Sequence, residues 1–366
     1  MDRYDPADLE RFASALLQTT GMAAEHADTV AESLVAADLR GHPSHGIHMV
    51  PTYVLWIEDG GMDESAAAEV VLDDGPALQV DGHHAIGHPV GRTATELAIE
   101  RVDDYPVVTV GIRKATHMGR IGWFAEMAAE AGLGFVGFTN MTSGDPVAVA
   151  GSAQRRFGTN PLTFGLPAFD ALDHPVLLDM ATSQVAFGKI NVRDTAGVPI
   201  DDSWTVTESG DPVPDATTFN EEELGALAPL GGQDAGYKGT GLMLMAELFA
   251  ATASDSPVTP QPDSRYENSA QFTLFDPLAF TSRSAHEARL VALEDYLDEI
   301  DYPEAVSAGG ASDYDRAYLP GRPEHETLSE RTAEGVPVPD EVIESLTATA
   351  TGRGVADEVL DPLVGD

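Results

Sequence analysis

Three histidines occur at intervals of three residues near the N-terminus, and an imidazole can carry protons at neutral pH or bind a metal ion. They are His42, His45 and His48. On a regular helix this spacing would place all three loosely on one face, as a metal site requires. Pro43 and Gly46 oppose such a helix, and no nearby carboxylate completes a ligand set. The pattern favours one working histidine, His45, over a metal-dependent hydrolase built on His42, His45 and His48; a capping residue among surface histidines is the simplest alternative.

The lysines are too few to be a general surface feature. Only Lys114, Lys189 and Lys238 occur among 20 basic residues, against 61 acidic ones, so we expect each to have a specific role. Lys238 lies in a glycine-rich stretch, 229–241, which we expect to precede an apolar helix at 242–250. A glycine-rich turn with a cation before a helix suits an anion such as a dinucleotide pyrophosphate. The order of residues is not that of a P-loop, and an ordinary helix lysine remains the alternative for Lys189.

A third candidate motif, G-x-G-x-x-G, occupies residues 132–137. In a Rossmann fold this motif follows a strand and opens a helix, so that the helix N-terminus meets the pyrophosphate. Here the apolar pattern predicts the reverse order, with a helix before the motif and a strand at 135–139. We therefore interpret Gly132 as the residue that ends a helix, and we reject the dinucleotide fingerprint.

The elements that must position these residues begin with helices. Asp5 and Pro6 are a capping residue and a first-turn proline, and a helix is predicted from there to about residue 17. A second helix is predicted at 23–39. A third should begin near Ser44 and reach Gly60, with Pro51 as a kink.

From about residue 70 short apolar runs alternate with helical patterns. The predicted strands are 77–80, 107–112, 134–139, 162–167 and 176–180, with helices at 88–103 and 121–132. Polar loops are predicted at 206–235, 255–270 and 307–315, and further helices at 285–300 and 339–350. This order predicts an α+β or α/β fold in which a sheet domain, 76–283, is inserted between helical segments, 1–75 and 284–366, that pack together.

The composition excludes several classes of protein. A formal net charge of −41 repels nucleic acid and anionic lipid, while 43% hydrophobic residues argue against disorder. The absence of cysteine excludes thiol catalysis, disulfides and cysteine-bound metals. No export signal or spanning segment is visible, so we expect a cytoplasmic protein. The dispersed acidity and scarce lysine fit a halophilic cytoplasm, where salt screens self-repulsion.

Taken together, the motifs resemble the type-2 malate/L-lactate dehydrogenase family, whose members include ureidoglycolate, sulfolactate and hydroxycarboxylate dehydrogenases and cyclic-imine reductases. The matching stretches follow the family order: Asp38–Gly46, His117–Gly122, Gly158–Leu162, Leu178–Ser183, Gly188-Lys189, Gly236–Leu242 and Leu319–Gly321. Arg120 and the segment 331–337 look most like the hydroxycarboxylate dehydrogenase branch. The resemblance implies a non-Rossmann, nicotinamide-binding sheet domain beside a helical catalytic and dimerisation domain, and a homodimer or higher assembly.

The resemblance also implies roles for individual residues. His45 would be the acid/base group with Ser44 beside it, His117 would lie next to nicotinamide and substrate, and Tyr53 would face the substrate. The residues expected to hold the cofactor are Asn140, Thr159, Asn160, Asp179, Met180, Ala181, Thr182, Ser183, Lys189, Lys238, Gly239, Gly321 and Arg322.

Two positions depart from the family pattern. Many members have an arginine four residues after the active-site histidine, suited to bidentate binding of a substrate carboxylate, where this chain has Met49. Arg40, His48 and Arg120 are the candidate replacements. The family also commonly has Pro-Gly-Glu where this chain has Arg322 in third place. An arginine near the adenosine ribose would favour a 2′-phosphate, so both NAD and NADP stay open, with NAD preferred.

We therefore expect a reversible hydride transfer between NAD(P)H and a small 2-oxo acid, with a proton moved by His45. Reduction of a cyclic imino acid by the same site is the close alternative. The metal-dependent hydrolase and a non-catalytic nucleotide-binding protein are alternatives of other classes.

Overall fold

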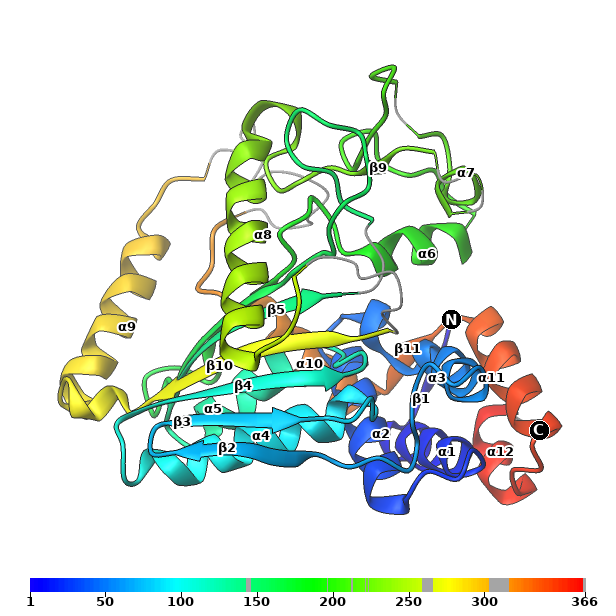
Figure 1. The fold of residues 1–366 in the computed structure, drawn as a ribbon, viewed down its shortest axis with the longest axis horizontal. Coiled ribbons are helices and arrows are strands. Elements are labelled where there is room, and N and C mark those ends of the chain that lie inside the picture. The colour runs from blue at the N-terminus through cyan, green and yellow to red at the C-terminus, as the bar shows by residue number, and fades with distance from the viewer. Residues whose placement is uncertain are drawn as a thin grey trace.

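The structure is a computed structural model that describes residues 1–142, 146–195, 197–211, 213–220, 222, 224–258, 266–302 and 316–364. Its centre is a mixed sheet of seven strands in the order β2-β3-β4-β10-β5-β6-β7 (Figure 1). The strands are β2 (Glu69–Asp74), β3 (Ala77–Asp81), β4 (Val107–Ala115), β10 (Asn268–Phe275), β5 (Gly134–Met141), β6 (Leu162–Leu166) and β7 (Val176–Met180). Only β3 and β4 pair in parallel; the other five neighbouring pairs are antiparallel.

Helices cover both faces of this sheet. On one face α4 (Gly87–Val102) and α5 (Gly122–Glu130) pack on a core that includes Val110, Phe124 and Phe272. On the other lies α8 (Gly232–Ser254), where Phe138 of β5 stacks on Phe249. Side chains of a strand point alternately to the two faces, so a strand buried on both sides is apolar almost throughout.

The two ends of the chain pack together, as predicted. Strand β1 (Asp2–Tyr4) pairs antiparallel with β11 (Val336–Val338), and both ends build one core beside the sheet (Figure 1). Its helices are α1 (Pro6–Gln18), α2 (Ala24–Leu39), α3 (Val50–Glu58), α11 (Asp340–Gly352) and α12 (Asp357–Val364). The predicted domain boundaries at 75/76 and 283/284 stay a prediction.

A third core joins helix α8 to buried side chains between Val147 and Leu227. It gathers Val147, Trp204, Phe219 and Met243. The elements of this region are α6 (Phe187–Thr195), β8 (Thr205–Val206), α7 (Ala216–Asn220) and β9 (Ala226–Leu227). Two more helices follow the sheet, α9 (Arg283–Asp298) and α10 (Arg322–Glu334).

Several predicted elements are corrected by the structure. The third helix begins at Val50 and not near Ser44, because two 3₁₀ turns, Pro43–His45 and Ile47–Met49, precede it; Pro51 opens the helix and does not kink it. Helix α8 begins at Gly232, so Lys238 lies inside the helix and not before it. The expected loops at 206–235 and 255–270 contain parts of β8, α7, β9, α8 and β10. The expected loop at 307–315 lies outside the described residues.

The order of elements around the glycine motif is confirmed. Helix α5 ends before Gly132, which adopts a left-handed φ of 79°, and β5 follows from Gly134. No helix in the described part of the chain is long and apolar enough to cross a membrane.

Candidate active site

The segment that carries His45 is held in place by a buried carboxylate. Asp38, near the end of α2, accepts a hydrogen bond from the Ile47 N–H at 2.7 Å. Gly46 lies against the same carboxylate, since a Cβ atom there would be 1.9 Å from Asp38 Oδ1. Burial raises the pKa of Asp38 to about 7, while the Ile47 hydrogen bond and the charge of Arg331 lower it. Asp38 thus fixes the two 3₁₀ turns on either side of Gly46.

His45 contacts two of the residues expected beside it. Its Nδ1 lies 3.0 Å from Ser44 Oγ, and its ring stacks on that of His117 with centroids 5.6 Å apart and planes 13° apart. The pKa of His45 is lowered to about 3, mainly by burial and also by the charges of His42, His48 and Arg120. His45 is therefore neutral at neutral pH and can accept a proton.

His117 follows β4 and is held by Tyr53 of α3. Its Nδ1 is 2.6 Å from the Tyr53 hydroxyl, which leaves only Nε2 for another partner. Burial lowers the pKa of His117 well below its usual value and raises that of Tyr53 above its usual value. Tyr53 is fully buried, so in this structure its hydroxyl contacts His117 and not an open space.

His88, near the start of α4, is a member of this cluster that the sequence analysis missed. It is fully buried, with its ring edge-on to Tyr53 at 5.6 Å and to His117 at 6.3 Å. Neither of its ring nitrogens has a hydrogen-bond partner among the described residues. The available signal was a histidine inside the apolar run 85–91, where α4 begins. Trp56 lies edge-on to His117, with ring centroids 6.4 Å apart, and stacks on Tyr266 at 4.3 Å.

The other two histidines of the N-terminal run do not converge on a metal site. His42 Nε2 lies 3.5 Å from Glu324 Oε1 on α10. Burial lowers the pKa of His48, although a backbone hydrogen bond at Pro43 raises it. The described residues contain no group of three or more histidine, cysteine, aspartate or glutamate side chains that could hold a metal. The hydrolase alternative therefore has no ligand set in that part of the chain.

Two arginines share one buried carboxylate next to the histidines. Arg120 Nη2 lies 2.6 Å from Glu126 Oε2, and Arg40 Nε lies 2.6 Å from Glu126 Oε1. Arg120 is only 4% exposed, and the charge of Arg120 is one of those that lower the pKa of His45. The remaining candidate, Arg40, also donates to the Ala36 carbonyl and so is tied to its own helix.

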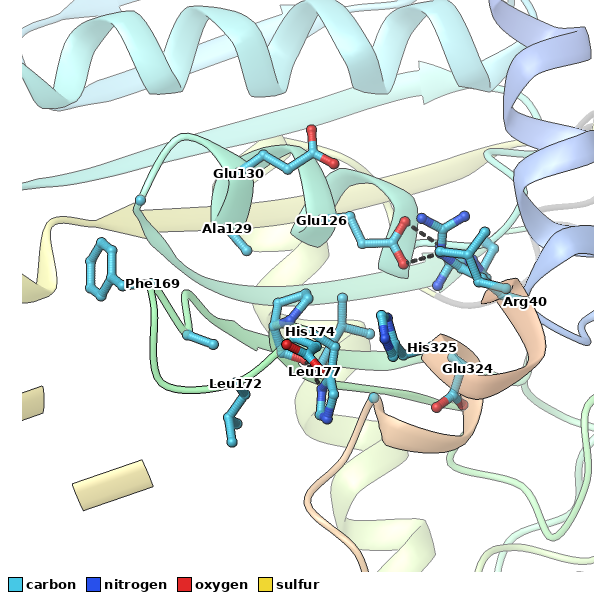
Figure 2. A pocket seen from close by; sticks show the side chains of 17 residues that line it. Arg40, Glu126, Ala129, Glu130, Phe169, Leu172, His174, Leu177, Glu324 and His325 are labelled. Atoms are coloured by element: carbon cyan, nitrogen blue, oxygen red, sulfur yellow. Dashed lines mark hydrogen bonds and ion pairs between the residues drawn. The ribbon is translucent and has the colours of Figure 1, made fainter. Parts of the chain in front are cut away.

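A cavity of about 480 Å³ adjoins these arginines, between α5, the segment 168–177 and the start of α10. We name it the α5–α10 cavity; its lining includes Arg40, Arg120, Glu126, Glu130, Asp173, His174, Gly321, Glu324 and His325. Figure 2 shows Glu126 turned toward Arg40 and the ring of His325 close to that of His174, with centroids 5.5 Å apart. Gly321 has a left-handed φ of 98° and lies against the carbonyl of Pro175.

The predicted cofactor residues at the ends of β6 and β7 lie together. Both oxygens of Asp179 are bonded, one to the Gly122 N–H that opens α5 and one to the Thr163 hydroxyl, each at 2.7 Å. The Thr182 hydroxyl donates to the carbonyls of Thr159 and Asn160. Met180 and Ala181 connect these two positions.

Asn140 and Asn160 form a second group behind them. Their amides donate to the two oxygens of Glu247 on α8, at 3.3 and 2.7 Å, and Glu247 is almost fully buried. These contacts tie α8 to the strand ends and hold both asparagine amides in place.

Backbone hydrogen bonds of Leu230 connect Gly239 with Thr182. The Gly239 N–H donates to the Leu230 carbonyl, and the Leu230 N–H donates to the Thr182 carbonyl; the neighbouring Ser183 forms an isolated bridge with Pro229. Lys238 is exposed beside this segment, over the ring of Tyr237. On α6, Gly188 packs against Ser44. The next residue, Lys189, therefore lies close to the segment that carries His45.

Arg322 lies apart from the rest of the predicted set. Its guanidinium pairs with Glu326 at 3.0 Å and Glu294 at 3.9 Å, and it lies over the ring of Tyr318. It does not line the α5–α10 cavity, although its neighbour Gly321 does.

Known proteins resemble this chain over nearly all of its length. The family model described as malate/L-lactate dehydrogenase matches residues 4–347. A hydroxycarboxylate dehydrogenase B of Escherichia coli O157:H7 is 30% identical over 98% of this chain and 96% of its own. A ureidoglycolate dehydrogenase (NAD(+)) of the same organism is 31% identical over 90% of each chain. A solved malate dehydrogenase of Pyrococcus horikoshii superposes with a TM-score of 0.82 at 29% identity, covering 97% of this chain and 96% of that one.

Proposed function

Because the chain belongs to the malate/L-lactate dehydrogenase family, we propose that the histidine cluster around His45 is its catalytic centre. The chain is an oxidoreductase of small 2-hydroxy and 2-oxo acids and uses a nicotinamide cofactor. The observation that carries the assignment of the centre is the stack of His45 on His117, with Ser44 and Tyr53 each bonded to one of the two rings.

His45 moves the proton in this proposal. A bound nicotinamide cofactor would take a hydride from, or give a hydride to, the substrate carbon that bears the hydroxyl or carbonyl oxygen. In oxidation, neutral His45 takes the proton of the substrate hydroxyl; in reduction, protonated His45 returns it to the carbonyl oxygen. Its low pKa in the free protein favours the neutral, accepting form. An anionic substrate nearby would raise that pKa, since opposite charge stabilises imidazolium.

Tyr53 and His117 supply a fixed hydrogen-bonding group beside the reacting atoms. Because burial raises the pKa of Tyr53, the phenol keeps its proton and can donate it to His117 Nδ1. His117 then carries its own proton on Nε2, from which it can donate a hydrogen bond to the substrate oxygen. Tyr53 in this proposal orients His117 and does not touch the substrate.

The residues present fit an anionic dinucleotide. Lys114 is paired with Asp81, but across the described ranges neither Lys189 nor Lys238 forms an ion pair, although the chain carries 61 carboxylates. An unpaired cation in so acidic a protein is free to bind a phosphate. We propose that these two lysines, with the Thr159–Asn160 and Asp179–Ser183 segments and Gly239, hold the cofactor.

We propose NAD over NADP. The α5–α10 cavity, lined by Gly321, would take the adenosine half. Its two arginines, Arg40 and Arg120, are both paired with Glu126, whereas three further carboxylates line it: Glu130, Asp173 and Glu324. Carboxylates accept hydrogen bonds from ribose hydroxyls and repel a 2′-phosphate. Arg322, the residue that would favour NADP, is already paired with Glu326 and Glu294. As the resemblance implies, we also expect a homodimer.

The test is the variant His45→Ala. Loss of a general acid or base is expected to lower kcat by about 10²- to 10⁴-fold, with NADH binding retained. Oxidation of NADH and NADPH followed at 340 nm, with a panel of 2-oxo acids and cyclic imines, measures this. A near-normal kcat in the variant would remove His45 from the role.

A further inference from the structure

Helix α10 is held on the body of the protein by polar contacts. None of its 13 residues is buried, so the helix has no apolar face that would fix its position. Elements that bury little apolar surface lie at the low end of local stability, where a few contacts decide their position. The polar groups that α10 meets therefore determine where this helix lies.

The start of α10 forms one wall of the α5–α10 cavity. Gly321, just before the helix, adopts a left-handed φ of 98°, and a Cβ there would lie 2.6 Å from the Pro175 carbonyl oxygen. The Leu177 N–H donates to the Pro320 carbonyl at 2.9 Å. A ligand in this cavity would thus contact the start of the helix and the segment 168–177 at the same time.

The same part of α10 also contacts the segment that precedes His45. The Oε1 atom of Glu324, which lines the cavity (Figure 2), lies 3.5 Å from His42 Nε2. The His42 carbonyl accepts from the His45 N–H at 3.0 Å, so this pair reaches the first 3₁₀ turn directly. Further along the helix, Thr327 packs against Gly41, where a Cβ would lie 3.4 Å from the Thr327 methyl group.

The far end of α10 reaches the other side of His45. Arg331 Nη1 donates to the Asp38 carbonyl, and the charge of Arg331 acts on the Asp38 carboxylate. That carboxylate accepts from the Ile47 N–H and lies against Gly46, which follows His45 in the chain. Contacts from one helix therefore hold the turns on both sides of His45.

We propose that α10 couples the α5–α10 cavity to the two 3₁₀ turns, with Glu324 and Arg331 as the residues that position His45. When the cavity is filled, the start of α10 is fixed, and α10 in turn holds the turns in the arrangement that proton transfer needs. This inference rests on the proposed function, which places the adenosine half of the cofactor in the cavity. It adds that the adenosine half supports the rate of the reaction and not only the affinity for the cofactor.

The test supplies the cofactor to the full-length protein as two separate halves. AMP carries the adenosine group, and reduced nicotinamide mononucleotide carries the hydride donor. Coupling between two sites usually amounts to an effect of about 5- to 150-fold. We therefore expect AMP to raise kcat with the mononucleotide by at least about 5-fold, with little change in the KM for the 2-oxo acid.

A second measurement does not depend on catalysis. Binding of AMP should slow the exchange of amide hydrogens in residues 38–47, among them the Ile47 N–H that donates to Asp38. Hydrogen exchange followed by mass spectrometry reports this protection. Calorimetric titration of AMP reports the affinity in the same samples.

The decisive variant is Arg331→Met, because Arg331 contacts the turns but does not line the cavity. AMP should still bind to this variant, whereas both the activation by AMP and the protection of residues 38–47 should be lost. Arg331→Lys keeps the positive charge, so it should retain part of both effects, and it covers the case in which Arg331→Met does not fold. The matched control is Arg3→Met, which removes an arginine paired with Glu330 and Glu334 on the same helix; it should behave like the unmodified protein.

Several outcomes would overturn the inference. Bound AMP might fail to activate the unmodified protein, or Arg331→Met might keep the full activation. An equal loss in Arg3→Met would show a general loosening of α10 in place of a specific link. Absence of AMP binding would also overturn it, and the role of His45 would still stand if NADH reduced a 2-oxo acid. Failure of the proposed function looks different, because the unmodified protein would then oxidise NADH with none of the 2-oxo acids.

Discussion

At the scale of single residues, the chemistry of the site depends on the protonation state of His45. Burial holds its pKa at about 3 in the folded protein, against 6.5 for an exposed imidazole. The charges of the neighbouring His42, His48 and Arg120 act in the same direction. His45 is consequently a base that stays ready through the whole neutral range and loses that readiness only in strong acid.

This state leads to a prediction about pH. Since the kcat/KM of the free enzyme reports the pKa of its catalytic base, oxidation of a 2-hydroxy acid should stay level as the pH falls from about 8 to about 5. Reduction needs protonated His45, so its kcat/KM should increase steadily over the same interval. Steady-state rates in both directions across this range provide the measurement. A fall in the oxidation rate centred near pH 6.5 would show that His45 titrates as an ordinary exposed histidine.

Much of the site was predictable at this scale because its residues sit in compact motifs. Ser44, His45 and His117 are brought together as the resemblance implied. The hydrogen bond between Tyr53 and His117 joins residues 64 positions apart, so no local pattern could reveal it. His88 and Glu126 were missed for the same reason: each acts through contacts made by the tertiary fold. Arg322 occupies the sequence position at which the resemblance implies a cofactor residue. Its guanidinium instead pairs with glutamates on α9 and α10, and these contacts depend on helix packing that the sequence pattern does not reveal.

At the scale of elements, the two 3₁₀ turns that carry His45 depend on one glycine. Between them Gly46 adopts an ordinary extended φ of −94°, so its backbone conformation does not require glycine. The close approach of Asp38 does, because a Cβ at that position would lie 1.9 Å from the carboxylate. A methyl group must therefore displace either Asp38 or the turns.

Gly46→Ala is thus expected to lower both stability and activity. We expect a cost of about 1–3 kcal/mol in the free energy of unfolding, the usual range for inserting a group into a packed region, and a large loss of kcat as His45 shifts. Denaturant unfolding and steady-state kinetics measure the two effects. The matched control is Gly241→Ala on α8, where no atom lies within 4 Å of the added Cβ. The control should gain about 0.5–1 kcal/mol, because alanine is the better helix residue; equal behaviour of the two variants would contradict the packing argument.

The elements themselves were predicted best where the sequence is apolar and regular. The strands within 77–81, 107–115, 134–141, 162–166 and 176–180 were found from their apolar runs. Strand β10 was missed although it is central, because Asn268, Ser269 and Gln271 interrupt the apolar pattern. The Asn268 amide donates to the Asn140 carbonyl on β5, and the Gln271 amide donates to Thr273 of its own strand. Edge strand β2 was missed because all six of its residues are exposed. Helix α10 was missed because it has no buried residue and therefore no apolar face.

At the scale of the whole molecule, a strongly acidic chain must still provide basic residues that can bind an anionic cofactor. The ion pairs in the described part of the chain engage most of its arginines, and the acidic residues outnumber the basic ones by three to one. A net charge of −41 on a compact chain destabilises it through self-repulsion at low ionic strength. Lys189 and Lys238 are exposed and form no ion pair within the described ranges, and they are the residues to which the proposed function assigns the phosphates of the cofactor.

Salt should therefore stabilise this protein over a wide range. Raising KCl from about 0.1 M to about 3 M shortens the Debye length from about 10 Å to under about 3 Å, which screens the repulsion between surface carboxylates. We expect Tm to rise continuously over that range, by more than the few degrees that one kcal/mol of added stability gives a domain of this size. Differential scanning calorimetry in KCl measures the rise, and the same series in sucrose, which stabilises without screening, serves as the control. If KCl and sucrose gave equal increases, or if Tm did not change with KCl, the acidic surface would not be an adaptation to salt.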